Sequence, residues 1–214
     1  MIRSACARMC AGFFRCGRFD IPRMFLNNEI KAGYCTYHME TGQDRIMQKY
    51  QYLSSCLNKE GLLQKDTLFL MPGKIILNAE GEPVSSSFFN RTDAEYALFT
   101  HGLYSLRYAG RKQDLKASID DMAQMFGRTV YSREAPERKD CACLIHDRGF
   151  FVTARYEKEL TAAAVLMEKA CRTEILAEKI GSVRYLNPAL CEAEHLVYLL
   201  KYSKHEKEAA DERE

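Results

Sequence analysis

The strongest periodic pattern of apolar residues in the chain lies between residues 160 and 175. Apolar side chains recur there every three or four residues, at Leu160, Ala164, Met167, Cys171 and Ile175. This spacing puts them on one face of an α-helix, because a helix completes a turn in about 3.6 residues. The pattern predicts a long amphipathic helix that ends near Gly181, with Glu168 and Arg172 paired four residues apart on its surface.

Two short apolar runs before this helix, at 141–145 and 150–154, predict a pair of β-strands. Residues 146–149 would join them in a tight turn, in which Gly149 can adopt a positive φ. A second hairpin is predicted at 67–71 and 74–78, split by Pro72 and Gly73. Short strands that precede helices along the chain predict an α/β fold, in which helices cover a sheet.

The segment from residue 92 to about residue 106 carries a helix-start signal. Thr92 is followed three residues later by Glu95, which is the spacing of a capping box. The predicted helix would carry His101, Tyr104 and Arg107.

Other helices are predicted from start and stop residues at both ends of the chain. One covers 44–57 and ends near Gly61, and a helical turn or two is predicted over 121–126. Asn187 and Pro188 supply an N-cap and a first-turn proline for a last helix that runs to about residue 202. Residues 201–214 mix both charges and are predicted to fray into solvent.

The length of 214 residues favours one large domain over two small ones. The pattern divides into a variable N-terminal extension over 1–43, a folded domain over 44–202 and a charged tail over 203–214. Lys and Arg number 31 against 29 Asp and Glu, and this balance argues against a dedicated nucleic-acid binder. Because no run approaches the ~18 continuous apolar residues of a membrane span, we expect no membrane partner.

Nine cysteines, an odd number at irregular spacing, point to reduced thiols in a cytoplasmic protein. Cys6, Cys10 and Cys16 form the one cluster to weigh as a metal site, and packing as small buried hydrophobes is the favoured interpretation. The first nineteen residues contain four arginines and no acid. That composition is typical of organelle-targeting peptides, but the scarcity of serine favours a variable extension.

The C-terminal third resembles the class II aldolase/adducin family. The family has an apolar strand that ends in a turn before a glycine, a second apolar strand, and a long Ala-rich helix. The residues that match in order are Leu144, Ile145, Gly149, Phe150, Phe151, Val152, Arg155, Met167, Glu168, Lys169 and Ala170. Upstream, Thr92, Glu95, Tyr104 and Arg107 resemble a second family segment, and residues 114–117 resemble the run before its metal-binding strand. The resemblance covers about residues 60–202.

The resemblance implies a three-layer α/β/α fold with a central, mainly antiparallel sheet, and a homotetramer. It also implies a divalent metal, usually zinc, held by three histidines. The reaction implied is reversible retro-aldol cleavage of a sugar phosphate, with the metal polarising the ketose. Glu95 would carry the proton, and Tyr104 would belong to the same catalytic site.

The implied metal ligands are replaced in this sequence. The family's His-x-His pair falls by register on Asp120 and Met122, and its third histidine falls on Arg148. A guanidinium cannot ligate a metal, and its charge would repel one. Asp120 and Asp121 could instead hold Mg²⁺ or Mn²⁺ through oxygen, with His101 near Glu95 as a further candidate ligand. Alternatively, Asp120 is a helix N-cap.

Substrate contacts are also open to two interpretations. Arg148 could bind a phosphate or carboxylate in place of the metal, or could form a salt bridge with Asp147. Ser85 and Ser86 offer hydroxyls to a substrate, and a solvent-exposed polar loop explains them equally well. His146 could swing inward from its turn, although exposure is favoured, and His38 and His195 are expected to be structural or surface residues.

Two functions follow. The first is a class II aldolase-like carbohydrate lyase with an altered metal site. The second is a non-catalytic protein of the same fold, which binds a small anionic metabolite or serves as an assembly subunit. A metal analysis of the purified protein would discriminate between them.

Overall fold

The computed structural model describes residues 42–211, with the side chains described up to residue 201. Cys6, Cys10, Cys16, His38 and the four N-terminal arginines therefore lie outside the described residues. The helices are α1 (Gly42–Lys59), α2 (Leu103–Ala109), α3 (Asp120–Phe126), α4 (Glu157–Ile180) and α5 (Pro188–Asp211). The strands are β1 (Leu68–Met71), β2 (Ile75–Leu77), β3 (Tyr96–Thr100), β4 (Leu115–Lys116), β5 (Thr129–Arg133), β6 (Ala142–Ile145) and β7 (Gly149–Ala154).

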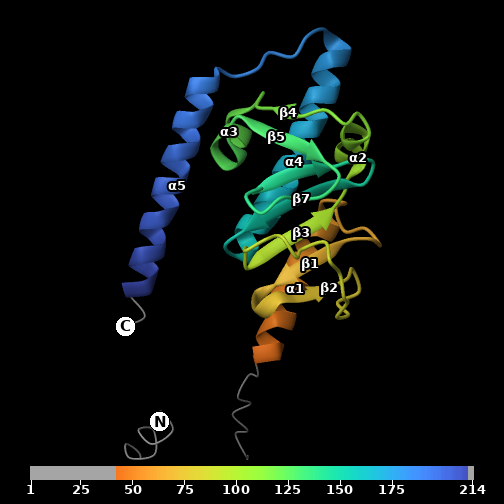
Figure 1. The fold of residues 1–214 in the computed structure, drawn as a ribbon, viewed down its shortest axis with the longest axis vertical. Helices are drawn as coiled ribbons and strands as arrows, with labels where there is room; N and C mark the ends of the chain where they lie inside the picture. The colour runs from red at the N-terminus through yellow and green to blue at the C-terminus, as the bar shows by residue number, and fades with distance from the viewer. Residues whose placement is uncertain (1–41, 212–214) are drawn as a thin grey trace, which may run out of the picture. The chain divides into compact units, whose positions relative to one another are not determined.

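The strands form one seven-stranded sheet in the order β2-β1-β3-β7-β6-β5-β4 (Figure 1). Every neighbouring pair is antiparallel except β5 and β6, which run parallel. The expected α/β fold with a central, mainly antiparallel sheet is thereby confirmed. The β6–β7 hairpin lies in the middle of the sheet, so the segment on which the resemblance depends is part of the core.

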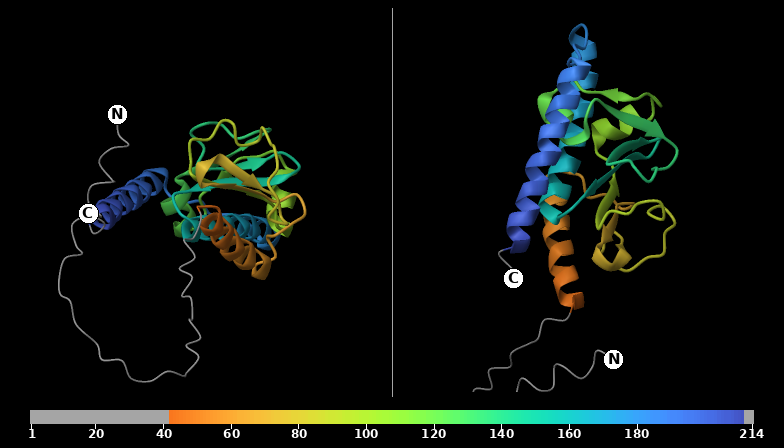
Figure 2. Two further views of the ribbon diagram at one scale, coloured as in Figure 1. Left: turned by 90° about the horizontal axis from the view of Figure 1, so that it is seen from below. Right: turned by 60° about the vertical axis from the view of Figure 1, so that its left-hand side comes forward.

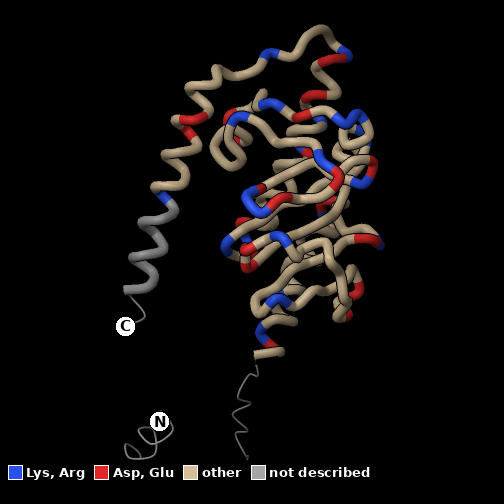
Figure 3. The backbone as a smooth tube through the Cα atoms, in the orientation of Figure 1, with Lys and Arg blue, Asp and Glu red and all other residues tan. Residues whose placement is uncertain are grey.

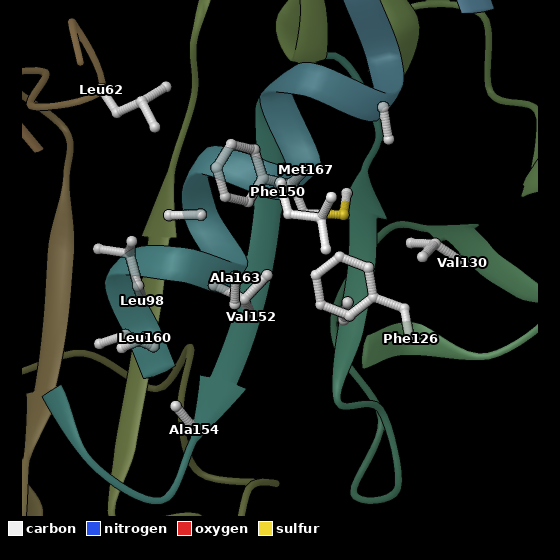
Figure 4. Close-up of a cluster of buried hydrophobic side chains, with 14 of the residues drawn as sticks. Leu62, Leu98, Phe126, Val130, Phe150, Val152, Ala154, Leu160, Ala163 and Met167 are labelled. Atoms are coloured by element: carbon white, nitrogen blue, oxygen red, sulfur yellow. The ribbon is translucent and has the colours of Figure 1, made fainter. Parts of the chain in front are cut away.

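Helices α1 and α4 pack on one face of this sheet, and Figure 2 shows both on the same side. The predicted apolar stripe of α4 is confirmed, since Leu160, Ala164, Met167 and Cys171 are all fully buried. Met167 and Ala163 lie against Phe150 and Val152 of β7 (Figure 4). Burial of such side chains is worth roughly 1.5–3 kcal/mol each, so this contact is a principal source of the domain's stability.

The other face of the sheet carries a smaller apolar cluster. Phe99, Phe151, Cys143 and Ile145 point to this side and are fully buried. Phe88 and Phe89, from the connection between β2 and β3, cover them, with Phe88 4.7 Å from Phe99 between ring centroids. This aromatic layer attaches the 78–95 connection to the sheet.

The predicted helix over 92–106 is wrong in its first half. Residues 96–100 form β3, and all five are buried between β1 and β7. Helix α2 begins only at Leu103. The Thr92 hydroxyl accepts a hydrogen bond from the Ala94 N–H at 3.3 Å, in a local turn rather than a helix cap. The pairing of a fully apolar run with two neighbouring strands outweighs the local capping signal.

The remaining elements agree with the sequence in kind and differ in extent. The hairpin around Pro72 and Gly73 forms as predicted. Strands β4 and β5 were not predicted, and α5 continues to Asp211 instead of fraying after residue 202. Helix α5 follows an extended connection after α4 and contacts α3 (Figure 1). Within residues 42–211, no helix is long and apolar enough to cross a membrane.

Candidate functional site

The end of β3 meets the turn between β6 and β7. Thr100 pairs with Phe150, so the next residue, His101, faces Gly149. Gly149 has φ +129°, and a Cβ there would lie 2.4 Å from the Thr100 carbonyl oxygen and 2.5 Å from the His101 Cβ. Only glycine fits this approach, because a side chain would collide with backbone as well as requiring a strained φ. The result is a fixed junction between His101 and the turn that carries Arg148.

Arg148 lies against two aromatic rings at this junction. Its guanidinium carbon is 4.9 Å from the ring centroid of Phe99 and 5.7 Å from that of Phe88. The expected salt bridge with Asp147 does not form, because Asp147 pairs with Lys112 at 2.9 Å. Among the described residues, no hydrogen bond or ion pair occupies the guanidinium N–H groups of Arg148. These cation–π contacts therefore position the guanidinium and leave its N–H donors available to a ligand.

His101 is oriented by an acidic partner from the start of β1. Its Nε2 lies 3.2 Å from the Asp66 carboxylate. Directly behind, the buried hydroxyls of Thr67 and Thr100 are 2.9 Å apart, and the Thr100 hydroxyl donates to the Leu62 carbonyl. These hydrogen bonds join the ends of β1 and β3, so the position of His101 is set by buried structure.

Tyr104 belongs to the first turn of α2. Its backbone N–H donates to the Glu168 carboxylate at 2.7 Å, and its ring lies 5.5 Å from the Arg172 guanidinium carbon. The predicted surface pair of Glu168 and Arg172 is therefore replaced by contacts of both residues with α2. Tyr104 lies three residues from His101, so it stays a candidate member of this site.

The serines approach Arg148 through Phe88. The Ser86 hydroxyl accepts a hydrogen bond from the Phe88 N–H at 3.2 Å, and the Phe88 ring contacts Arg148. Ser85 is exposed next to Ser86. The fold thus brings His101 and Arg148 together at one end of β3, and Ser86 is linked to Arg148 only through Phe88.

Glu95 does not join them. It precedes β3, whereas His101 follows it, so the two residues are roughly 20 Å apart along the strand. The register confirms this separation, since Tyr96 pairs with Ala154 at one end of β7 and Thr100 with Phe150 at the other. Glu95, the expected proton carrier, therefore does not lie beside Arg148, because residues 96–100 form a strand and not the predicted helix.

The predicted metal ligands are also dispersed. Asp120 and Asp121 lie in the first turn of α3, where Asp121 pairs with Lys169 at 2.8 Å. The N-cap residue is Ile119, so the capping role of Asp120 is wrong as well. Met122 is fully buried. Within residues 42–201, no three His, Cys, Asp or Glu side chains are close enough to share an ion.

The donor set at the end of β3 does not fit a zinc centre. Among residues 42–201, only His101 and Asp66 bring possible ligand atoms together there, and the neighbouring positions hold the ring of Phe99 and the cation of Arg148. Zinc requires three or four nitrogen, sulfur or oxygen ligands, and a fixed positive charge beside it is unfavourable.

Phe99, Phe88 and Asp66 are parts of this site that the sequence reasoning missed. The available signal was the mostly apolar run at 96–100, followed by His101, which is typical of a buried strand that leads into a polar edge. His146, by comparison, is half-buried and takes no part in the cluster, and His195 Nδ1 bonds the Gln124 carbonyl oxygen at 2.8 Å in a structural contact.

The five cysteines within residues 42–201 are free thiols. Cys143 and Cys171 are fully buried, and burial raises the pKa of both thiols. Both serve as small core residues, whereas Cys141, just before the strand that holds Cys143, is exposed.

Comparison with known proteins identifies solved structures with a similar fold. No protein-family model and no curated protein sequence matches the chain. An L-fuculose 1-phosphate aldolase superposes with a TM-score of 0.59 at 13% identity, over 74% of this chain and 98% of the other. The L-fuculose 1-phosphate aldolase of Glaciozyma antarctica gives 0.56 at 12% identity, over 71% and 81%.

The L-fuculose-1-phosphate aldolase of Thermus thermophilus gives a TM-score of 0.52 at 14% identity, over 65% of this chain and 99% of the other. Identities at this level speak for the fold and not for the chemistry. Together with the central β6–β7 hairpin, these similarities show that the chain has the class II aldolase fold.

Proposed function

We propose that this protein binds a small anionic metabolite, such as a sugar phosphate, through Arg148, and that it does so without metal-assisted cleavage. The observation that supports the proposal is the stacking of the Arg148 guanidinium on Phe99 and Phe88 beside His101. A cation thus stands where the resemblance implied a metal ligand.

The chemistry of the cluster suits an anion with several oxygens. A guanidinium presents a planar set of N–H donors, which can engage a phosphate or carboxylate through two parallel hydrogen bonds. Because two rings hold the guanidinium, little side-chain freedom is lost on binding. His101, oriented by Asp66, supplies a polar edge, and Ser85 and Ser86, in the segment just before Phe88, are candidate hydroxyl donors.

The test compares ligands that differ only in the phosphate. L-fuculose 1-phosphate, L-fuculose and inorganic phosphate are titrated calorimetrically into the wild type, Arg148→Met, Arg148→Lys and the control Arg138→Met. Arg138 is an exposed arginine paired with Asp93 away from the cluster. We expect the two phosphates to bind and unphosphorylated L-fuculose not to, with at least tenfold weaker binding in Arg148→Met and a smaller loss in Arg148→Lys. Equal affinity in the wild type and Arg148→Met would overturn the proposal.

A metal-dependent lyase is the second candidate, favoured by the names of the similar structures. It requires a third ligand that the end of β3 lacks and a proton carrier closer than Glu95. Incubation with zinc and L-fuculose 1-phosphate tests it through aldehyde release. Release that is lost in Glu95→Gln would establish the lyase and exclude our proposal. The homo-oligomer, including the tetramer, and the cytoplasmic localisation stay predictions.

A further inference from the structure

A cavity lies at the opposite end of β3 from Arg148. Its volume is about 400 Å³. Four segments bring charged side chains to it: Glu95 before β3, Lys139 before β6, Arg155 after β7, and Glu159 in the first turn of α4. His195 of α5 completes its polar lining. The cavity is therefore formed by tertiary structure and not by one loop.

Hydrogen bonds fix the walls of this cavity. The Thr153 N–H donates to the Cys141 carbonyl oxygen at 2.8 Å, which holds the start of β6 against the end of β7. Helix α5 is attached on the other side, where His195 Nδ1 meets the Gln124 carbonyl oxygen at 2.8 Å. The Tyr198 hydroxyl donates to Glu159 Oε1 at 3.0 Å. A preformed cavity of this size is typical of small-molecule sites.

The charges in the cavity divide into those already used by the fold and those left for a ligand. The Glu159 carboxylate accepts hydrogen bonds from the Tyr198 hydroxyl and, at 2.9 Å, from the backbone N–H of Arg155. It therefore stabilises the wall of the cavity. Arg155 has contacts of its own. Glu95 and Lys139 line the cavity at its solvent-exposed side, and within the described part of the chain neither takes part in a hydrogen bond or an ion pair, with each other or with a third residue.

An unpaired carboxylate and an unpaired ammonium in one cavity select a ligand with both charges. A simple anion would pair with Lys139 and be repelled by Glu95. A simple cation would pair with Glu95 and be repelled by Lys139. Met125, Phe126, Ala154 and Leu199 supply apolar surface to the lining of the same cavity. That surface suits a short aliphatic link.

We infer that this cavity binds a small zwitterion of the amino-acid type, with the ligand's ammonium on Glu95 and its carboxylate on Lys139. The site is independent of the anion site at Arg148. Figure 3 shows Lys, Arg, Asp and Glu interspersed along the described part of the chain.

The test uses a series of ω-amino acids from glycine to 6-aminohexanoate, titrated into the full-length protein and followed by calorimetry. Each is compared with the carboxylate and the amine of the same length, for example 5-aminopentanoate with pentanoate and pentylamine. We expect at least one member of the series to bind tenfold or more tightly than both of its single-charge analogues. The length of that member measures the separation of Glu95 and Lys139.

Two variants assign the contacts. Glu95→Gln should weaken the preferred zwitterion at least fivefold and should tighten the corresponding carboxylate, because the repelling charge is removed. Lys139→Met should also weaken the zwitterion at least fivefold, and it should tighten the corresponding amine. Glu82→Gln and Lys158→Met, at exposed positions outside the cavity, serve as matched controls. Two results would overturn the inference. One is that no ω-amino acid binds more tightly than its single-charge analogues. The other is that the preferred ω-amino acid binds Glu95→Gln and Lys139→Met as tightly as it binds the wild type. An absence of phosphate binding at Arg148 would not change the binding of ω-amino acids at the opposite end of β3, so each proposal can be refuted without the other.

Discussion

The carboxylate of Glu168 accepts a hydrogen bond from the backbone N–H of Tyr104, two helices apart in the sequence. Its second oxygen accepts from the Ser105 N–H at 2.9 Å. Both N–H groups belong to the first turn of α2, which has no capping side chain of its own because Gly102 occupies the N-cap. A Cβ at Gly102 would lie 2.4 Å from the Glu168 carboxyl carbon. A residue of α4 thus caps α2, and glycine leaves the room for it.

Removal of this cap should destabilise the domain. Glu168→Ala leaves two N–H groups of α2 without their acceptor, and we expect a loss of about 1–2 kcal/mol in the free energy of unfolding. Urea denaturation measures it. Glu178→Ala, which removes an exposed carboxylate from the same helix, should cost clearly less. Equal losses would mean that the cap contributes nothing beyond helix propensity.

Gly149→Ala should be more costly. The substitution combines a strained φ with a 2.4 Å approach to the Thr100 carbonyl oxygen, and backbone cannot yield as a flexible side chain does. We expect a loss of about 2–3 kcal/mol and weaker anion binding, because His101 and Arg148 must separate. Gly42→Ala, at a position with nothing within 4 Å, is the control for thermal unfolding. An unchanged melting temperature for Gly149→Ala would contradict the geometry.

The stability of the domain should depend on pH through Glu174. This residue of α4 is 1% exposed, and burial raises the pKa of its carboxyl group. Its Oε1 accepts from the Tyr185 hydroxyl at 2.6 Å, and this hydrogen bond raises the pKa of Tyr185 to about 12. Because the folded state binds the Glu174 proton more tightly than the unfolded state, the stability from this group is present at low pH. It is lost as the pH rises through the folded pKa.

Glu174→Gln should therefore raise the melting temperature at pH 7.5 and change it little at pH 4, where the wild-type carboxyl is largely protonated in both states. The amide oxygen can still accept from Tyr185. Thermal unfolding across this pH range, with Glu178→Gln as an exposed control on the same helix, measures the difference. A stabilisation that is equal at both pH values would exclude ionisation as its cause.

Replacement of Asp121 should leave metal binding unchanged. Its carboxylate pairs with Lys169 on the surface, and both side chains are more than half exposed. Such pairs contribute roughly 0–1 kcal/mol, so Asp121→Asn should have little effect on unfolding. Calorimetric titration with Mn²⁺ and Zn²⁺ should give the same result for the variant and the wild type. Stoichiometric Mn²⁺ binding that disappears in Asp121→Asn would restore Asp121 as a ligand.

The sequence alone determined the parts of the fold that depend on local pattern. The stripe from Leu160 to Ile175 specified α4, and the apolar runs on either side of residues 146–149 specified the β6–β7 hairpin. Helix α4 and the β6–β7 hairpin are each formed by one continuous stretch of sequence. Each buries the face that its pattern of apolar residues predicted. The class II aldolase resemblance rested on these segments, which is why the fold class was predictable.

Tertiary structure decided the site. Residues 96–100 form a strand and not a helix because β1 and β7 pair with them on both sides. The local sequence does not indicate that these two partners are present. That choice places Glu95 and His101 at opposite ends of a strand instead of on neighbouring turns of a helix. It also brings Phe88 and Phe99 to Arg148, although these residues are far apart in the chain. Side-chain convergence arises from non-local pairing, so it follows from the folded structure and not from spacing along the sequence.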